Sequence, residues 1–336
     1  MTRSATGRTL DIHAHIIETE TLALIRRELP DCGLELHTTE GEFGTLVISG
    51  APYHNFPRGG WDVARRLADM DRAGFDRQLL AVVPQTVLYD ASGADGLTAS
   101  RIQNEAIAAR VRAMPERFMG LATVPMQAPD LAAAELRRAM TKDGLKGAMI
   151  GSHVEGRNLD DPALDPFWAE AEAQGAFLLL HPVKIAGMDR QKSYYLNNFV
   201  GNPLDTTIAA ACLVFGGVLE RFPGLNIVLS HGGGFTPYQA ARWVHGWAER
   251  AEAKVRLKGE PGPSIDRLLF DTILHGPAQL QFLVDWAGAE RVMLGSDYPF
   301  DMGQYDACEV IDSLRITATA REALLFAAAE ARMPRG

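Results

Sequence analysis

The stretch Ala176-Phe177-Leu178-Leu179-Leu180-His181-Pro182 carries the pattern that decides the fold. Five consecutive apolar residues predict a strand buried on both faces, and a histidine stands directly at its end. The same pattern recurs in residues 227–230, which His231 follows, and in residues 292–296, which Asp297 follows. Buried strands of this kind belong to parallel sheets covered by helices on their faces.

Working outward from this stretch, eight predicted strands alternate with eight predicted helices along the chain. We expect strands at residues 9–14, 77–83, 118–124, 146–151, 176–181, 226–230, 268–272 and 292–296. The clearest helical periodicity covers residues 61–73, 100–114, 131–141, 166–174, 203–220, 237–254, 278–286 and 319–331. This α/β alternation predicts a (β/α)8 TIM barrel, formed by residues 1–336 as one domain. A doubly wound open sheet is the alternative, although the first turn lacks a Gly-x-Gly-x-x-Gly fingerprint.

The segment 16–60 interrupts the alternation after the first strand. It contains a predicted helix at residues 19–28, a glycine-rich stretch and a short predicted strand at residues 45–48. An insertion of this length at the carboxyl end of a barrel strand is long enough to act as a lid over the active-site face. The connection 184–201 after the fifth strand lies on the same face.

The composition indicates a globular protein of the cytoplasm. Of 336 residues, 47% are hydrophobic and 22% are charged, which excludes disorder. The net charge of -9 argues against nucleic acid or anionic lipid as a partner. No apolar run spans a bilayer and the start lacks a signal-peptide core, so we expect no membrane contact. Three scattered cysteines, Cys32, Cys212 and Cys308, form no disulfide framework.

Residues suited to metal binding or proton transfer stand at the ends of four predicted strands. His13 and His15 are two apart in a strand, so both imidazoles point to the same side. His181, His231 and Asp297 end three further strands, and a barrel brings its strand ends to one mouth. Taken singly, each of these residues could equally be a hydrogen-bonded polar residue at a strand end. Taken together, the set indicates an active site.

Several motifs together resemble the amidohydrolase superfamily. They are the Asp-x-His-x-His opening at residues 11–15, His-Pro at 181–182, His-Gly-Gly-Gly at 231–234 and Gly-Ser-Asp-Tyr-Pro-Phe at 295–300. Gly-Ser-His at 151–153 and Asn-Pro at 202–203 extend the similarity over most of the chain. The chain is most similar to the branch that contains α-amino-β-carboxymuconate-ε-semialdehyde decarboxylase and the aromatic-acid decarboxylases.

The resemblance implies one divalent metal ion, with Zn²⁺ expected, held by His13, His15, His181 and Asp297. A water completing such a site has its pKa lowered from about 15.7 toward about 7. The resemblance makes His231 the general acid/base, with Asp297 also catalytic. No lysine stands where binuclear members use a bridging one, which favours a mononuclear site. We expect Asp11 and Ser296 to have a supporting, structural role. Asp271 and His275 would face the mouth of the barrel and could contact substrate, although a structural role is the simpler interpretation for both.

Substrate contacts follow from the same resemblance. Arg242 stands eleven residues after His231, where a family member uses an arginine to reach a substrate carboxylate across a dimer interface. This implies a homodimer, with a bidentate guanidinium–carboxylate contact. The chain departs from the family in the insertion, where His54 stands in place of a second arginine and Arg58 follows four residues later. Tyr194 and Tyr195 are candidates for an aromatic wall, and His275 for a substrate contact.

We therefore predict a metal-dependent, non-oxidative decarboxylase of an aromatic or muconate-semialdehyde-type acid, with a small-molecule carboxylate as its substrate. The alternative is a mononuclear zinc hydrolase that uses a metal-bound hydroxide on an amide, ester, lactone or C–C bond, because the ligand set suits both reactions. A barrel that only binds a ligand would be favoured by a missing ligand or base, and neither is missing. The chain lacks a basic patch and any nucleic-acid reading motif.

Overall fold

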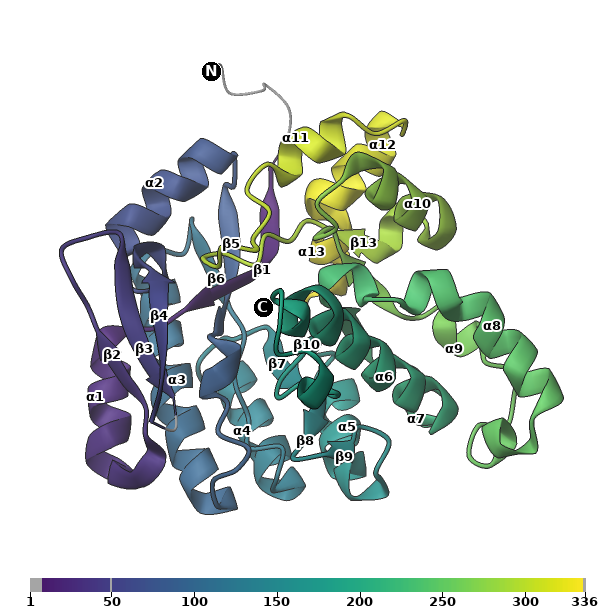
Figure 1. Cartoon of the computed structure of the whole chain (residues 1–336), viewed down its shortest axis with the longest axis horizontal. Coiled ribbons are helices and arrows are strands. Elements are labelled where there is room, and N and C mark those ends of the chain that lie inside the picture. The colour runs from purple at the N-terminus through teal and green to yellow at the C-terminus, as the bar shows by residue number, and fades with distance from the viewer. Residues whose placement is uncertain (1–7, 49, 335–336) are drawn as a thin grey trace.

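The computed structural model describes residues 8–48 and 50–334, and it is an α/β barrel (Figure 1). The barrel strands are β1 (Leu10–Ile16), β5 (Arg77–Val82), β6 (Phe118–Gly120), β7 (Gly147–Gly151), β10 (Phe177–His181), β11 (Asn226–Leu229), β12 (Leu269–Asp271) and β13 (Val292–Met293). All their pairings are parallel, in the orders β1-β5-β6 and β13-β12-β11-β10-β7.

Two parallel bridges close these sheets into a ring. Ala122 pairs with Ala148 between β6 and β7, and Ala14 pairs with Tyr298 between β1 and the segment after β13. The backbone N–H of Ile12 also donates to the carbonyl oxygen of Leu294, at 2.9 Å. The predicted TIM barrel is therefore confirmed, and the open doubly wound sheet is excluded.

The barrel strands are buried along their length, as their apolar sequences predict. Every residue of β1, β7, β10 and β12 is buried, because helices cover the outside of the ring and side chains fill its inside. Several strands end earlier than predicted. Residues 230, 272 and 294–296 lie beyond β11, β12 and β13, where the chain turns into the loops of the carboxyl face.

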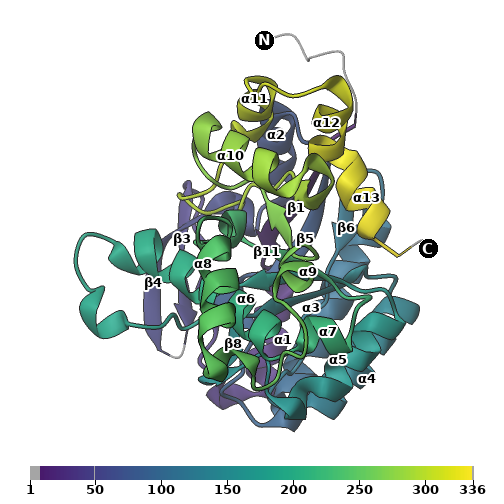
Figure 2. The same ribbon diagram turned by 90° about the vertical axis from the view of Figure 1, so that its right-hand side faces the viewer.

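Helices surround the strands (Figures 1 and 2). They are α2 (Val63–Ala73), α3 (Gly93–Ala113), α4 (Pro129–Thr141), α5 (Asp165–Ala173), α6 (Asn202–Phe215), α7 (Val218–Arg221), α8 (Thr236–Glu249), α9 (Gly262–Ile265), α10 (Pro277–Ala287), α11 (Ala307–Asp312), α12 (Ala318–Glu322) and α13 (Ala328–Arg332). The single helix predicted at 203–220 is wrong, because Gly217 takes a left-handed φ of 69° and separates α6 from α7. Among the described helices, none is long and apolar enough to cross a membrane.

The chain between β1 and α2 forms elements outside the barrel. Helix α1 (Thr19–Glu28) is followed by an antiparallel sheet of β2 (Glu35–His37), β3 (Phe43–Ile48) and β4 (Ala51–Pro57), seen at the left of Figure 1. These elements have an apolar core of their own, which includes Ile25, Leu46 and Phe56. Val83 and Leu88, which follow β5, complete this core and attach the insertion to the barrel. A second small hairpin, β8 (His153–Val154) and β9 (Arg157–Asn158), follows β7.

Candidate metal centre

Four side chains from three barrel strands meet at the carboxyl end of the ring. His13 and His15 lie on β1, His181 ends β10, and Asp297 follows β13. Each offers one ligand atom, and these atoms all lie within 4.8 Å of one another. The Nε2 atoms of His13 and His15 are 3.0 Å apart. The barrel thus brings together the four residues that the sequence singled out as metal ligands.

Hydrogen bonds fix the tautomer of all three imidazoles. The Nδ1 of His15 lies 2.9 Å from the carbonyl oxygen of Val82, and the Nδ1 of His181 lies 2.9 Å from that of Pro182. The Nδ1 of His13 lies 2.7 Å from the Asp271 carboxylate. Carbonyl and carboxylate oxygens only accept, so each Nδ1 carries the hydrogen and each neutral ring keeps its lone pair on Nε2.

The three Nε2 lone pairs converge on one carboxylate oxygen. Oδ1 of Asp297 lies 3.1 Å from the Nε2 of His15, 3.4 Å from that of His13 and 3.9 Å from that of His181. In the described part of the chain, the Nε2 of His181 has no hydrogen-bond partner. Lone pairs that face one another in a buried site repel unless a cation lies between them, and imidazole with carboxylate is a ligand set that zinc and related divalent metals accept.

The ionisation of the cluster also suits a cation. Burial lowers the pKa of His15, and burial together with the neighbouring histidines lowers the pKa of His181 to about 3, so both rings are neutral at pH 7. Burial opposes ionisation of Asp297, but the imidazoles around the carboxylate hold its pKa well below its usual range. Burial opposes ionisation of His13, but its hydrogen bond to Asp271 and the charges of Asp297 and Asp11 raise its pKa. His15 and His181 therefore offer neutral nitrogens, and Asp297 offers an anionic oxygen.

The Asp271 carboxylate is hydrogen-bonded both to His13, a proposed metal ligand, and to the backbone of His231, the candidate acid/base. Besides the ring of His13, its carboxylate accepts the backbone N–H groups of His231 at 2.9 Å and Gly232 at 2.7 Å. Burial alone would raise the pKa of Asp271, but these bonds and the nearby imidazoles lower it. Gly232 has a φ of 60°, and a β-carbon there would lie 2.5 Å from Leu274. Only glycine fits this turn, which presents His231 to the cluster.

His231 reaches the same carboxylate as the other three histidines. Its Nε2 lies 3.3 Å from Oδ2 of Asp297, and its side chain is 15% exposed. Both His231 and Asp297 have a positive φ, of 55° and 57°. Histidine and aspartate are among the residues that tolerate this conformation, and such backbone strain clusters at functional sites.

Asp11 supports the cluster from below, in keeping with its predicted structural role. One oxygen accepts the backbone N–H of His13 at 3.1 Å and that of Ser296 at 3.0 Å. The other accepts the Ser296 hydroxyl at 2.5 Å and the Gln78 amide at 2.9 Å. Burial raises the pKa of Asp11 to about 6. This one carboxylate joins the strand that carries His13 to the segment that carries Asp297.

An aromatic wall, which the sequence did not predict at these positions, connects the insertion with the cluster. The ring of Phe300 lies 5.5 Å from that of His15 and 6.2 Å from that of Phe56, which in turn lies 6.3 Å from that of Tyr53. Tyr53 is half-buried, and its burial, with the charges of Asp301, Tyr195 and Asp297, raises its pKa to about 12. Phe300 ends one of the family motifs, but Tyr53 lies in an insertion strand that carries none.

A cavity of about 300 Å³ opens on the same face. Val87 and Leu88 from the loop after β5, Pro182 and Ile185 from the loop after β10, and Ile48 from the insertion line it. Pro182 directly follows His181 in the chain, but none of the four clustered side chains lines this cavity.

The structure does not bring the residues predicted to contact substrate together at the metal cluster. Arg242 lies exposed on the outer surface of α8, beside Trp243 and Trp247. His54 is exposed, and its Nδ1 lies 3.3 Å from the Thr45 hydroxyl. Arg58 donates to the Asp62 carboxylate at 2.7 Å and to the Glu40 carbonyl oxygen at 2.8 Å, so its guanidinium links the insertion to the start of α2.

Tyr194 and His275, two further candidates for substrate contacts, are exposed. Tyr194 is 86% exposed, whereas its neighbour Tyr195 is 43% exposed. Burial, followed by the charges of Asp301 and Asp297, raises the pKa of Tyr195, whose ring packs against Phe199 at 5.4 Å. His275 has an exposed side chain, and its backbone N–H donates to Gln304. Tyr194 and His275 are thus exposed in this structure, and their contact with substrate stays a prediction.

Comparisons with known proteins agree with this geometry. A family model described as amidohydrolase matches residues 10–331. The chain is 36% identical over 282 residues to 2-amino-3-carboxymuconate-6-semialdehyde decarboxylase from Dictyostelium discoideum, covering 83% of this chain and 79% of that protein. The crystal structure of 5-carboxyvanillate decarboxylase from Sphingomonas paucimobilis superposes with a TM-score of 0.84 at 25% identity, covering 97% and 99% of the two chains.

A third relative has the same fold with a metal bound. Dihydroxybenzoic acid decarboxylase from Polaromonas sp. JS666 superposes with a TM-score of 0.79 at 21% identity, covering 97% of each chain. Its crystal contains manganese and the inhibitor 2-nitroresorcinol.

Proposed function

Because this chain belongs to the amidohydrolase family, we propose that it is a metal-dependent, non-oxidative decarboxylase of an aromatic or muconate-semialdehyde-type carboxylic acid. His13, His15, His181 and Asp297 hold one divalent cation. The observation that carries the proposal is the convergence of three Nε2 lone pairs on Oδ1 of Asp297, with every Nδ1 already bonded to an acceptor. The decarboxylase at 36% identity supports the reaction class.

The charges around the cluster support a divalent ion. The hydrogen-bonded set contains three buried carboxylates, Asp11, Asp271 and Asp297, and one buried guanidinium, that of Arg66. With neutral imidazoles these groups leave a net charge of −2, which a divalent cation neutralises. Zn²⁺ is the metal we propose, because three imidazoles and a carboxylate suit it. The manganese in the dihydroxybenzoic acid decarboxylase makes Mn²⁺ the competitor to test.

A divalent cation in this site supplies Lewis-acid chemistry, which fixes and polarises the oxygens of a bound acid. In the reaction, the bond between the carboxylate carbon and the unsaturated carbon that bears it breaks, the carboxylate leaves as CO₂, and that unsaturated carbon gains one proton. No electrons are gained or lost, so no redox cofactor is required.

His231 handles the proton in this scheme. Its Nε2 borders the cluster through Oδ2 of Asp297, and its Nδ1 has no partner among the described residues. Its backbone N–H is held by Asp271, so the ring keeps its place while the imidazole gives up and regains a proton. The partly exposed side chain allows exchange with solvent between turnovers.

The substrate carboxylate is the proposed partner of Arg242, supplied from the neighbouring subunit of a homodimer. Of the 14 residues of α8, only Thr236 and Ala240 are buried. The rest of that helix presents Tyr238, which is 79% exposed, and the half-buried Trp243 and Trp247 beside Arg242. An amphipathic surface of this kind is typical of a contact between subunits, and it supports Arg242 reaching the second site. The insertion 16–60 is the proposed lid, which carries Tyr53 toward the mouth.

A substrate panel tests the reaction. The purified, metal-loaded protein is incubated in D₂O with 2,6-dihydroxybenzoate, 5-carboxyvanillate and 2-amino-3-carboxymuconate-6-semialdehyde. We expect at least one acid to release one CO₂ per product, with one deuterium on the carbon that lost it. Cleavage of ester or lactone probes in H₂¹⁸O, with ¹⁸O in the product and no CO₂ from any acid, would instead establish the hydrolase.

A further inference from the structure

We propose that Arg66 is a positioning residue for the metal centre, which it holds through His15 and through Gln78 and Asp11. The inference rests on the metal ligands proposed above. Arg66 lies on α2, outside the barrel ring, and its side chain is fully buried. Within residues 8–48 and 50–334, no carboxylate forms an ion pair with it. A helix face that packs on a barrel ordinarily carries apolar residues, so a buried, unpaired guanidinium requires an explanation.

The guanidinium binds two groups that belong to the site. One nitrogen, Nη2, donates to the backbone carbonyl oxygen of His15. The other, Nη1, donates to the side-chain oxygen of Gln78 at 2.9 Å. Gln78 in turn donates from its amide nitrogen to Asp11 at 2.9 Å. The planar fork of a single arginine therefore fixes the backbone of one proposed ligand and the carboxylate that anchors two others.

The chain of contacts continues to His13 and Asp297. Asp11 accepts from the backbone of His13 on one side and from Ser296 on the other, directly before Asp297. β1 and β5 lose their regular register between Asp11 and Ala14. Without the regular ladder, this part of β1 depends on side-chain hydrogen bonds for its geometry. Arg66 begins this chain of hydrogen bonds, because it donates to Gln78, which donates to Asp11.

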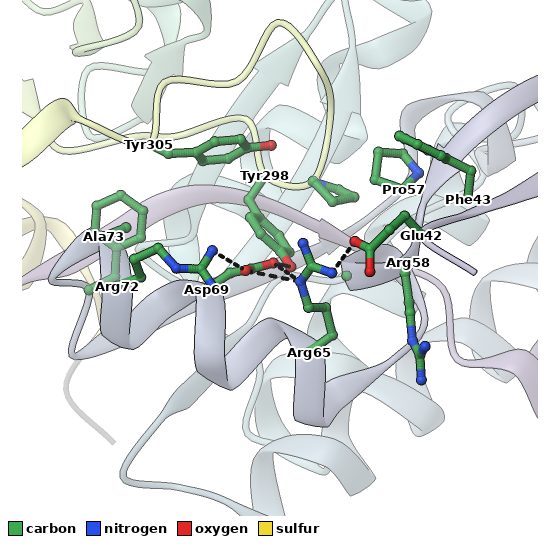
Figure 3. Close-up of a pocket in the computed structure, with 13 residues that line it drawn as sticks. Glu42, Phe43, Pro57, Arg58, Arg65, Asp69, Arg72, Ala73, Tyr298 and Tyr305 are labelled. Atoms are coloured by element: carbon green, nitrogen blue, oxygen red, sulfur yellow. Dashed lines mark hydrogen bonds and ion pairs between the residues drawn. The ribbon is translucent and has the colours of Figure 1, made fainter. Parts of the chain in front are cut away.

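Arg66 also contacts the segment that carries Asp297 through Tyr298. The guanidinium carbon lies 4.6 Å from the centre of the Tyr298 ring, in a cation–π contact. Figure 3 shows the hydroxyl end of Tyr298, which donates to Asp69 at 2.8 Å, with Arg65 and Arg72 on the same carboxylate. The carbonyl oxygen of Tyr298 accepts from the backbone of His15 at 2.6 Å.

Two of the three arginines on α2 line the pocket in Figure 3, and Arg66 is not among them. Arg65 and Arg72 line this cavity of about 270 Å³ and pair with acids at the surface. Arg66 points inward, where burial lowers its pKa to about 10 and leaves it protonated at neutral pH. A lysine would keep that charge, but a single ammonium cannot reproduce the planar fork that binds both acceptors. The shape of the group, rather than its charge alone, is what the site uses.

The test compares the metal affinity of R66K with that of the wild type. Partners that orient metal ligands are worth about 10- to 100-fold in affinity, so we expect the Zn²⁺ dissociation constant of R66K to rise by that factor. Competition with a chromogenic chelator gives the constant, and the visible spectrum of the Co²⁺-loaded protein reports the ligand geometry. R72M is the control, because Arg72 lies on the same helix, is 71% exposed and pairs with the Asp69 carboxylate.

A dissociation constant for R66K within threefold of the wild type, with an unchanged Co²⁺ spectrum, would overturn the inference. A purely structural role would lower the melting temperature of the metal-free protein without that change in affinity. Should R66K not fold, Q78M decides the question: it breaks the link to Asp11, and unchanged affinity in it overturns the inference equally. A wild type that binds neither Zn²⁺ nor Mn²⁺ would instead overturn the proposed function on which the inference rests.

Discussion

The carboxylate of Asp297 divides its two oxygens between His15 and His231. Oδ1 lies 3.1 Å from the Nε2 of His15, and Oδ2 lies 3.3 Å from the Nε2 of His231. One oxygen thus faces the three proposed metal ligands and the other faces the proposed proton carrier. In the proposed scheme, Asp297 therefore links metal binding to proton transfer, and the four histidines have two separate roles.

The first prediction concerns His231. H231Q should lower kcat by about 10²- to 10⁴-fold, the usual worth of a general acid/base, because glutamine cannot carry the transferred proton. Metal content should stay at the wild-type level, since the Nε2 of His231 faces Oδ2 rather than the cluster of ligand atoms. Steady-state kinetics and elemental analysis measure both. H37Q, at an exposed histidine of the insertion, is the control. Loss of metal in H231Q would assign this residue to the ligands instead.

The second prediction separates Tyr53 from Tyr194. Y53A should raise KM by about two- to tenfold, because a ring contact is worth about 0.5–1.5 kcal/mol and 1.4 kcal/mol is tenfold in affinity. Y194A should leave KM unchanged, since Tyr194 is 86% exposed. Kinetics with one substrate compare the two variants directly. A larger effect in Y194A would restore the sequence-based prediction and require the loop after β10 to fold over the site.

The sequence predicted the barrel and its metal cluster because both depend on local signals. Most barrel strands are apolar runs. His181 ends β10, His13 lies within β1 and Asp297 follows β13, and the barrel brings these positions together at its carboxyl face. Arg66 and Tyr53 could not be found in this way. An arginine on a helix reads as a surface residue, and only the packing of α2 on the barrel buries it. The side of β4 that faces the mouth depends on an antiparallel sheet whose register shifts between Gly44 and Thr45.

The third prediction tests whether subunits share their sites. R242A should raise KM for a carboxylate substrate by about 10-fold or more while leaving metal content intact, because a charge-assisted bidentate contact is lost. Coexpression of R242A with H231Q should then restore activity, since one site of each mixed dimer combines an intact His231 with an intact Arg242. Kinetics on the tagged mixed dimer measure this. No recovery in the mixed dimer would place Arg242 in the site of its own chain, or outside any site.

The fourth prediction concerns Asp62, which caps α2. Its carboxylate accepts the backbone N–H of Arg65 at 3.0 Å and pairs with Arg58, and these two bonds lower its pKa below the ordinary 3.8. D62A should lower the free energy of unfolding by about 0.5–2 kcal/mol at pH 7. Because the folded pKa is depressed, this contribution is complete above about pH 4 and is lost as the pH falls further.

Urea unfolding at pH 7, 5 and 3 checks that dependence. The difference between wild type and D62A should be the same at pH 7 and 5 and smaller at pH 3. D62N separates the two effects, because asparagine also caps helices but does not titrate. A difference that grows on acidification would contradict a depressed pKa for Asp62 in the folded protein.

The measurement that tests the central claim most directly is metal stoichiometry by elemental analysis, on the wild type and on H181A in parallel. His181 contributes only its Nε2 to the cluster, so its removal tests the ligand set itself. We predict near one equivalent of divalent metal in the wild type, largely lost in H181A and retained in H37Q. Absence of metal from the wild type after reloading with Zn²⁺ and Mn²⁺, or full retention in H181A, would contradict the proposed metal centre.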